Sequence, residues 1–481
     1  MPPLLADEYR RCRRRHETAQ VRRVGATCGH AAGSGFSLVE LMVALGIGAI
    51  VLLGLTDLLM NSKTAYLREE QLARLQENGR VAAMVAARQL RANRSMDCRS
   101  IAMAMADEGI ALGTPLAVKA CDLLDIPAGK HCADADWRAF RHYLSTDRAL
   151  GYDNSEDLGD AGALSDLPPS ARTNIADRWL RGDVLVTWGV DGPGTWLTDS
   201  VASDVNDGGI GAAGPIRVAV AGDGLRPGRY ALISDCIGAD VFEISGPEDL
   251  DGGSGDHELD HAQQDDQGDK VNASDALTRV YNWSSADTPA GQARQIPAPV
   301  HRANVYPLAY NVYYICCVDI GGGELQSGSG VRHCRSGEPV FNADRYRPSL
   351  CTWDMQTARS YPVVNDIADM RVTYTGDRDA DGALDFFAQD VDPIPTAAWV
   401  TAHHAWAGVR SAAVELLVVS GEAGVATQAN TPASADWPPN DGSGQIAADT
   451  LGQGLPADSR LHQRFHINVA MRSRAPWYIG P

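Results

Sequence analysis

The apolar residues of this chain are most concentrated near its amino terminus, over Leu41–Leu55. Phe36–Val39 before this stretch and Leu58–Met60 after it are also largely apolar. Together these residues approach the roughly 20 that an α-helix needs to cross a bilayer. Glu40 places a carboxylate near the start of the stretch, and an ionisable residue within a membrane is costly enough to indicate a function. The pattern predicts a membrane-spanning helix over residues 36–60.

The pattern changes after Met60 from apolar to amphipathic. Up to about Arg94 the chain has no proline, and apolar residues recur roughly every three or four positions between Arg, Glu and Gln. This is the period of a helix with one apolar face. Gly79 is its weak point, because glycine lowers helix propensity. We expect residues 61–94 to continue the first helix and to pack against a globular head. The apolar positions are Leu67, Leu72, Leu75, Val81, Val85 and Leu90.

Residues 95–481 have the pattern of a β-rich head. Short runs of Val, Ile, Tyr and Trp alternate with Gly-, Asp- and Pro-rich segments, which is typical of strands joined by loops. Residues 246–275 and 421–454 have few large apolar side chains, so we expect loops there, and we expect a helical segment near Cys132–Leu144. The fold class is therefore α+β, with a long N-terminal helical stem. The expected strands are Asp183–Trp188, Arg229–Ser234, Asp240–Ile244, Ala309–Val318, Met370–Tyr374, Ala412–Val419 and His466–Met471.

A specific motif, Gly35-Phe36-Ser37-Leu38-Val39-Glu40, begins the first helix. It resembles the class III signal of type IV prepilins, in which a membrane aspartyl peptidase cuts after the glycine and methylates the new amino terminus. The resemblance implies cleavage of the Gly35–Phe36 bond, methylation of Phe36 and a role in assembly for Glu40. In a low dielectric the Glu40 carboxylate would pair with the cationic amino terminus of a neighbouring subunit. An ordinary signal anchor that contains one glutamate is the alternative.

The leader, residues 1–35, is basic, whereas the rest of the chain is acidic. The positive-inside rule predicts that this Arg-rich end stays in the cytoplasm and that the head is exported to the periplasm. The chain carries a net charge of −19, and loss of a leader with seven Arg and three acids would leave −23. We therefore expect no nucleic-acid partner, since nucleic-acid binding requires a basic face. The prepilin resemblance implies a single-pass inner-membrane protein that later joins a fibre at the cell surface.

Two of the ten cysteines lie in the leader, and eight lie in the part expected to be exported. An even number of cysteines in an exported chain predicts disulfides. The absence of a C-x-x-C pair disfavours a zinc ribbon or a thioredoxin-like motif. Sequence proximity favours pairing within each of two groups, but the connectivity stays open. Cys316 and Cys317 are adjacent in an expected strand, so they should point to opposite faces and take different partners. The first group is Cys98, Cys121 and Cys132, the second is Cys316, Cys317, Cys334 and Cys351, and Cys236 lies between them.

Several runs in the head resemble the PilW group of type IV pilus assembly proteins, which are large minor pilins. The resemblance implies a low-abundance structural subunit that takes part in pilus initiation at or near the tip and supports adhesion and twitching motility. It implies prepilin peptidase, other minor and major pilins and the inner-membrane assembly platform as partners. A type II secretion pseudopilin and a tip adhesin that binds a surface ligand are the alternatives. The runs are Gly182–Val186, Ser234–Cys236 with Asp240–Phe242, Val364–Tyr374, and Arg464–Phe465 with Val469–Arg472.

A second motif, Asp377-Arg378-Asp379-Ala380-Asp381-Gly382-Ala383-Leu384-Asp385, matches the first nine positions of a calcium-binding loop. Asp377, Asp379, Asp381 and Asp385 would be the ligands of a Ca²⁺ ion. The final position departs from the pattern, because Ala388 stands where a bidentate glutamate is expected, and Asp390, slightly beyond, could substitute for it. A polar hairpin turn around the Asp-Gly pair is the alternative.

The segment His257-Glu258-Leu259-Asp260-His261 has the letters of a zinc-protease motif. That motif works only on a helix, where both histidines face one metal. The flanking residues are acidic and glycine-rich, with no apolar face to bury a helix. His403-His404 beside Trp406 is expected to be surface or core packing. Neither a G-x-S-x-G motif nor a P-loop is present, so we predict a structural, non-enzymatic protein.

Overall fold

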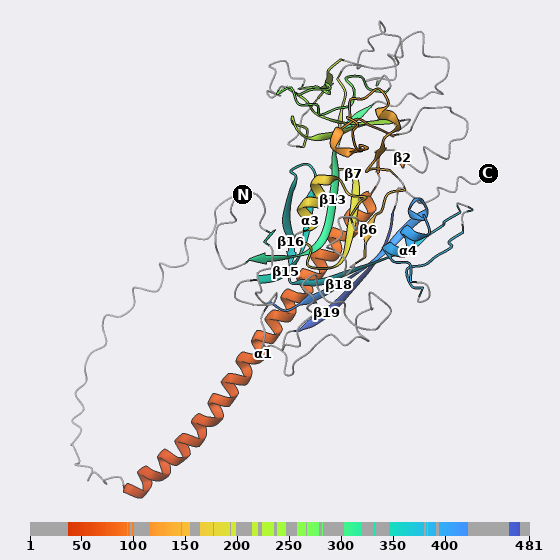
Figure 1. Cartoon of the computed structure of the whole chain (residues 1–481). Helices are drawn as coiled ribbons and strands as arrows, with labels where there is room; N and C mark the ends of the chain where they lie inside the picture. Colours follow the sequence, from red (N-terminus) through yellow and green to blue (C-terminus); the bar gives the residue numbers. More distant parts are fainter. Residues whose placement is uncertain are drawn as a thin grey trace, which may run out of the picture. The chain divides into compact units, whose positions relative to one another are not determined.

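The chain divides into two compact units, Met1–Lys63 and Thr64–Pro481, of which Figure 1 shows the computed structural model. The residues that the structure describes are 37–93, 95–96, 99–100, 116–145, 147–153, 164–176, 178–192, 194–198, 214–219, 224–234, 238–246, 257–265, 267–278, 281, 303–319, 331–332, 346–379, 381, 383–390, 394–421 and 461–471.

Helices are few and strands are many in the described part of the chain. The helices are α1 (Leu38–Ala92), α3 (Pro169–Ala176) and α4 (Ala397–Ala402), with 3₁₀ turns η1 (Cys121–Leu123), η2 (Trp137–Ala139) and η4 (Trp406–Gly408). The strands are β1 (Ser95–Met96), β2 (Arg99–Ser100), β3 (Leu116–Val118), β4 (Leu124–Asp125), β5 (Arg141–His142), β6 (Gly151–Tyr152), β7 (Arg181–Val190), β8 (Thr195–Trp196), β9 (Ile216–Val218), β10 (Tyr230–Ser234), β11 (Ala239–Glu243), β12 (His257–Leu259), β13 (Asn304–Asp319), β14 (Val331–Arg332), β15 (Tyr346–Asp354), β16 (Arg359–Asn365), β17 (Ile367–Gly376), β18 (Val409–Val419) and β19 (His462–Ala470).

Helix α1 is continuous over 55 residues and contains both predicted segments. Its apolar residues up to Met60 are exposed, whereas residues beyond Thr64 belong to the second unit and contribute to its core. Leu72 lies outside the buried face, with 42% of its surface exposed, contrary to the spacing inferred from the sequence. The buried face instead includes the small residues Gly79, Ala82 and Ala86, which let the helix approach the head closely. The buried face consists of Gln71, Leu75, Gly79, Ala82, Ala86 and Leu90.

The main sheet is built around β13. Its strand order is β16-β15-β13-β10-β11-β3, and β7, β8 and β14 also pair with β13. Most neighbours are antiparallel, but β3 pairs in parallel with β11. The 16 residues of β13 allow different strands to pair with it along its length, and Figure 1 shows β7, β13, β15 and β16 running beside one another.

A second sheet, β17-β18-β19, completes the head together with α1. One buried core lies on a face of β13 that carries Tyr310, Val312 and Tyr314. A second core contains Tyr313 and Ile315 from the opposite face, the inner residues of β17 and β18, and the buried face of α1. A third, smaller core contains Leu197, residues of β9, β10, β11 and β12, and Val305 at the start of β13. The alternation of side chains along β13 thus divides the head into separate cores.

The expected strands are present, and the α+β class is confirmed. Two local predictions need correction. Residues 246–275 were expected to be a loop, and of these residues 247–256 and 266 lie outside the described part. In the described remainder β12 pairs with β9, and Asn272 ties the following segment to β11 through its side-chain hydrogen bonds to Glu243. The region Cys132–Leu144 holds the 3₁₀ turn η2 and strand β5 in place of the expected helical segment, because a disulfide at its start and the β4–β5 pair near its end constrain it. From the expected loop at residues 421–454, residues 422–454 lie outside the described part.

Candidate functional site

The first candidate site is the start of α1. Gly35 and Phe36 lie outside the described residues, whereas Glu40 lies in the first helical turn. The backbone N–H of Ser37 donates to Glu40 Oε2 at 3.4 Å, and the backbone N–H of Leu41 donates to the Ser37 carbonyl at 3.1 Å. Ser37 and Glu40 therefore have the spacing and one of the two contacts of a capping box. The glutamate stabilises the helix start as well as carrying a charge there.

The helix that follows is suited to a membrane. Within the described residues, α1 is the one helix that is long and apolar enough to cross a bilayer. None of the residues in its most apolar stretch is buried against the protein, and residues such as Leu45, Ile50 and Leu53 each expose about two thirds of their surface. An exposed apolar surface of this extent needs lipid or another apolar partner. The helix and its signal together indicate membrane anchoring.

The second candidate site is the aspartate loop after β17. Asp377, Asp379 and Asp385 each present a carboxylate oxygen within 4.8 Å of the others. The loop is held by its own side chains: Asp385 Oδ2 accepts from the Arg378 N–H at 2.6 Å, and Asp379 Oδ1 accepts from the Asp381 N–H at 3.2 Å. Three carboxylates so close together repel one another unless a cation lies among them. Oxygen ligands of this kind suit Ca²⁺.

Two features separate this loop from the sequence prediction. Asp381 does not belong to the converging group, and its Oδ1 instead accepts from the Ala383 N–H at 2.7 Å. Asp377 is only 3% exposed and forms an ion pair with Arg410, with 3.4 Å between Nη2 and Oδ2. Asp390 Oδ2 accepts from the Phe387 N–H at 2.8 Å. The structure thus brings together three of the four predicted ligands.

The segment with the zinc-protease letters is extended, not helical. His257, Glu258 and Leu259 form β12, and Glu258 pairs with Arg217 of β9 at 2.9 Å. His261 is buried against the ring of Phe242, with 5.6 Å between ring centroids, and burial lowers its pKa to about 4. His257 lies in β12, whereas His261 lies two residues beyond its end. The two histidines therefore do not share one face of a helix, as a common zinc ion in this motif requires.

His403 and Trp406 take part in packing around α4. The ring of His403 stacks on Trp399 with 4.1 Å between centroids, and Trp406 packs edge-on against Tyr374 at 4.9 Å. His403 is the C-cap of α4, and His404, the next residue, has a positive φ of 51°. These contacts agree with the packing role expected from the sequence.

Two disulfides are present in the described residues. Cys121 pairs with Cys132, and Cys316 pairs with Cys351. Each pair lies within one of the two groups that sequence proximity favours. Cys98, Cys236 and Cys334 lie outside the described residues, as does the side chain of Cys317. The first disulfide closes the segment that carries η1 and β4, and the second joins the adjacent strands β13 and β15.

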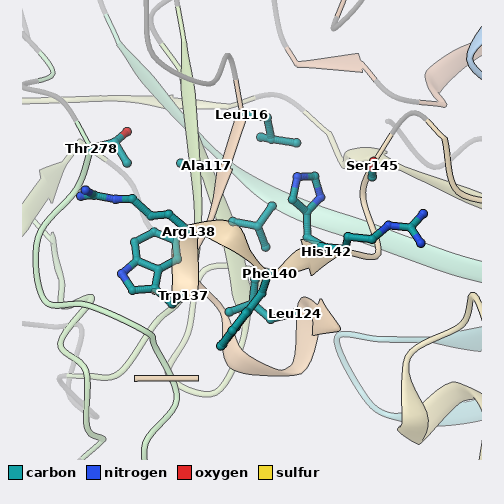
Figure 2. Close-up of a pocket in the computed structure, with 11 residues that line it drawn as sticks. Leu116, Ala117, Leu124, Trp137, Arg138, Phe140, His142, Ser145 and Thr278 are labelled. Atoms are coloured by element: carbon teal, nitrogen blue, oxygen red, sulfur yellow. The ribbon is translucent and has the colours of Figure 1, made fainter. Parts of the chain in front are cut away.

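A pocket that the sequence does not reveal lies beside β3. Its volume is about 170 Å³, and Figure 2 shows Arg138 and Thr278 on one side of it and His142 and Ser145 on the other. Its lining comes from β3, from the β4–η2–β5 segment and from a loop about 130 residues later in the sequence. No local motif therefore predicts this pocket. The lining residues are Leu116, Ala117, Val118, Leu124, Trp137, Arg138, Phe140, Arg141, His142, Ser145 and Thr278.

Charged groups are buried next to this pocket. Asp240 accepts hydrogen bonds from Thr278 and from the Tyr281 hydroxyl, each at 2.8 Å. Lys119 follows β3 directly and is fully buried, and desolvation lowers the pKa of its amine to about 8, although Asp240 opposes the shift. The hydrogen bonds of Asp240 tie the segment around residue 278 to β11, and the backbone N–H of Lys119 ties the end of β3 to Val241 of the same strand.

One comparison with known proteins gives a match. Residues 32–56 match the model of the prokaryotic N-terminal methylation motif. No curated protein and no solved structure matches the chain. The matched residues contain the Gly35–Phe36 bond, Glu40 and most of the apolar part of α1. The motif and the helix together support a type IV pilin-like or pseudopilin-type protein.

Proposed function

We propose that this chain is a minor pilin of the PilW type, a structural subunit that helps to initiate a type IV pilus at or near its tip. The methylation motif joined to one continuous apolar helix carries the proposal. The β-rich head on the second half of that helix supports it. In this role prepilin peptidase cuts the Gly35–Phe36 bond and methylates Phe36. The subunit waits in the inner membrane with its head in the periplasm, then joins other pilins on the assembly platform.

Glu40 has two proposed roles, to cap the helix through its contact with Ser37 and to pair its charge with a neighbouring amino terminus. One experiment separates them. A glutamine at position 40 keeps an acceptor for the Ser37 N–H, while alanine removes both the acceptor and the charge. If the charge pairs with a neighbouring amino terminus, Glu40→Gln and Glu40→Ala both reduce the protein in sheared pili by about tenfold, roughly 1.4 kcal/mol. Intact-mass analysis of membrane-extracted protein should show all three chains starting at methylated Phe36.

The controls distinguish this proposal from its rivals. Wild-type levels of Glu40→Gln in pili would limit the glutamate to helix capping. An uncut chain in cells that contain the peptidase would overturn the minor-pilin proposal itself. Deletion of the gene should abolish pili and twitching motility. Loss of secretion with intact pili would instead identify a secretion pseudopilin, and intact pili that no longer adhere would identify an adhesin.

We also propose that the aspartate loop binds Ca²⁺. The convergence of the carboxylates of Asp377, Asp379 and Asp385 within 4.8 Å supports this. A ligand that binds only the folded state raises stability by about 2.7 kcal/mol at a hundred times its Kd. The full chain in detergent should therefore melt several degrees higher in millimolar calcium than in chelator.

The structure selects the variants for this test. Asp377 is a poor choice, because its ion pair with Arg410 contributes to stability without calcium. Asp379 is exposed, and an asparagine there keeps the acceptor for the Asp381 N–H, so Asp379→Asn should erase the calcium effect alone. Asp390→Asn is the matched control, because Asp390 lies outside the converging group. If the wild-type chain has the same melting temperature in calcium and in chelator, the loop does not bind calcium and is a polar turn only.

A further inference from the structure

A second pocket lies between the second half of α1 and the edge of the main sheet. Its volume is about 390 Å³, within the range of roughly 300–1,000 Å³ that small-molecule sites occupy. One wall is α1, whose lining residues recur every three or four positions and so share a face of the helix. They are Gln71, Arg74, Asn78 and Val81. The other wall comes from β15, from β16 and from the turn that follows β16.

Gln71 is the buried polar group of this pocket. It lies on the buried face of α1 and is only 3% exposed, and its side chain makes no hydrogen bond within the described residues. A buried amide without a partner opposes folding, because folding removes it from water. The pocket beside it has room for a ligand that supplies the missing hydrogen bonds.

The charged groups of the pocket already have counter-charges. Asp366, in the turn after β16, is buried, and its Oδ2 accepts from Asn78 Nδ2 at 3.2 Å and from Arg347 Nη1 at 3.5 Å. Arg74 pairs with Glu70, one turn earlier on α1, at 2.6 Å. Two guanidinium groups and two carboxylates therefore balance one another, so the pocket favours neither an anionic nor a cationic ligand.

The hydrogen-bonding groups that remain are those of side-chain amides. Asn365 Oδ1 accepts from the Ser349 hydroxyl at 3.0 Å, but in the described part of the chain its NH₂ group has no partner. The same holds there for the side-chain oxygen of Asn78 and for both ends of the Gln71 amide. The pocket thus offers donors and acceptors together. A hydroxyl group both donates and accepts, whereas a carboxylate only accepts and an ammonium only donates.

An apolar wall accompanies these amides. It consists of Val81 from α1 and of Val363 and Val364 from β16. The volume corresponds to about 13 water molecules at about 30 Å³ each, which is room for one sugar ring and its hydroxyl groups. A sugar ring carries hydroxyl groups at its edge and C–H groups on its faces, so it matches both the amides and the valines.

We propose that this pocket binds one neutral hexose ring of a carbohydrate. Hydroxyl groups of the ring bond to the amides of Gln71, Asn78 and Asn365, and its C–H groups pack on the valines. Leu75 of α1 and Val364 of β16 belong to the same core, which holds the two walls together, so little ordering opposes binding. The proposal rests neither on the minor-pilin assignment nor on the calcium loop.

The test uses the full chain in micelles of a polyoxyethylene detergent, because a sugar-based detergent would compete for the pocket. The probes are the methyl glycosides of glucose, galactose, mannose and N-acetylglucosamine. Glucuronate serves as an anionic probe and N-acetylglycinamide as a peptide-like probe. In ligand-observed NMR at millimolar concentrations, we expect saturable binding of at least one glycoside. That glycoside should bind at least tenfold more tightly than glucuronate or N-acetylglycinamide.

Matched substitutions locate the site. Gln71→Met keeps the length of the side chain but removes its donors and its acceptor, so it should weaken glycoside binding at least tenfold. Its melting temperature should not fall, because the lost amide has no protein partner. Gln76→Met makes the same change at an exposed position of α1 outside the pocket and should leave binding unchanged. Asn365→Ala, at an exposed position on the other wall, should also weaken binding about tenfold and leave the fold intact.

The absence of binding by all four glycosides would overturn the proposal. Equal binding by the Gln71→Met and Gln76→Met chains, or full binding by Asn365→Ala, would also overturn it. Tighter binding of glucuronate would identify an anion site, and tighter binding of N-acetylglycinamide would identify a peptide site. Either result would contradict a carbohydrate pocket.

Discussion

The environment of Glu243 on β11 disfavours the charged form of its carboxyl group. Burial, together with the neighbouring charges of Asp122 and Asp265, raises its pKa to about 7. Because the folded state binds the proton more tightly than the unfolded chain, stability falls as pH rises from about 4.5 to about 7. Below that range the acid is neutral in both states, and above it the full cost remains.

Replacing this acid should therefore stabilise the protein only at higher pH. Glu243→Gln keeps the shape of the side chain and removes the charge. We expect it to raise the free energy of unfolding by about 1–2 kcal/mol at pH 8, after allowance for solvent screening, and to change little near pH 4.5. Chemical denaturation at the two pH values measures the difference. Glu258→Gln is the control, since its exposed ion pair with Arg217 contributes little at either pH. An equal gain at both pH values would show that charge is not the cause.

Local motifs made some site residues predictable from the sequence, and distance in the sequence hid others. Glu40 and the aspartates at 377, 379 and 385 lie in short runs whose spacing reveals their chemistry. Arg138 and His142 line one pocket only because the fold brings β3 and the loop near Thr278 beside them. Asp381 has the same spacing as its neighbours but turns to the Ala383 N–H. Spacing identifies candidates for a site, whereas the folded backbone decides which of them meet.

At the scale of elements, the packing of α1 on β19 depends on Gly79. A Cβ added there would lie 2.2 Å from the ring of Phe465. Alanine normally favours a helix by about 1 kcal/mol over glycine. Here we expect Gly79→Ala to destabilise the head by about 1–3 kcal/mol through overpacking. In a Phe465→Ala background the clash is absent, so the same change should stabilise. Thermal melting of the four proteins gives both values, and additive effects would contradict the contact.

The strands were easier to predict than the packing between elements. Runs of β-branched and aromatic residues marked β7, β13 and β18 because those strands lie inside the sheets and are buried on both faces. Strand β12 was missed because its acidic, glycine-rich surroundings resemble a loop, and its pairing with β9 is a long-range contact. The buried face of α1 was also misjudged, because close packing favours Gly79, Ala82 and Ala86 over the larger Leu72.

At the scale of the whole molecule, the second half of α1 is part of the head. Leu75, Ala82, Ala86 and Leu90 belong to the same core as β17 and β18. A chain that begins at Thr64 should therefore be soluble and melt cooperatively. A chain that begins at Ser95 lacks these side chains and loses several kcal/mol of apolar burial, at about 25 cal/mol per Å². We expect it to be insoluble or without a cooperative transition.

A peptide of residues 64–94 supplied in trans provides the control for this truncation. It should restore cooperative melting to the shorter chain, and the same peptide with Leu75 and Leu90 changed to Asp should not. Equal melting of the two truncated chains would show that the helix is dispensable to the head.

The alternation along β13 has a consequence for how such a chain can vary. Tyr310, Val312 and Tyr314 face one core, and Tyr313 and Ile315 face another. Inserting or deleting a single residue within the strand would exchange the two sets, so that both cores would lose their fit at once. Lengthening a surface connection costs far less, about 0.6 kcal/mol for each doubling. Changes in chain length should therefore accumulate between the strands of this head, while the length of β13 stays fixed.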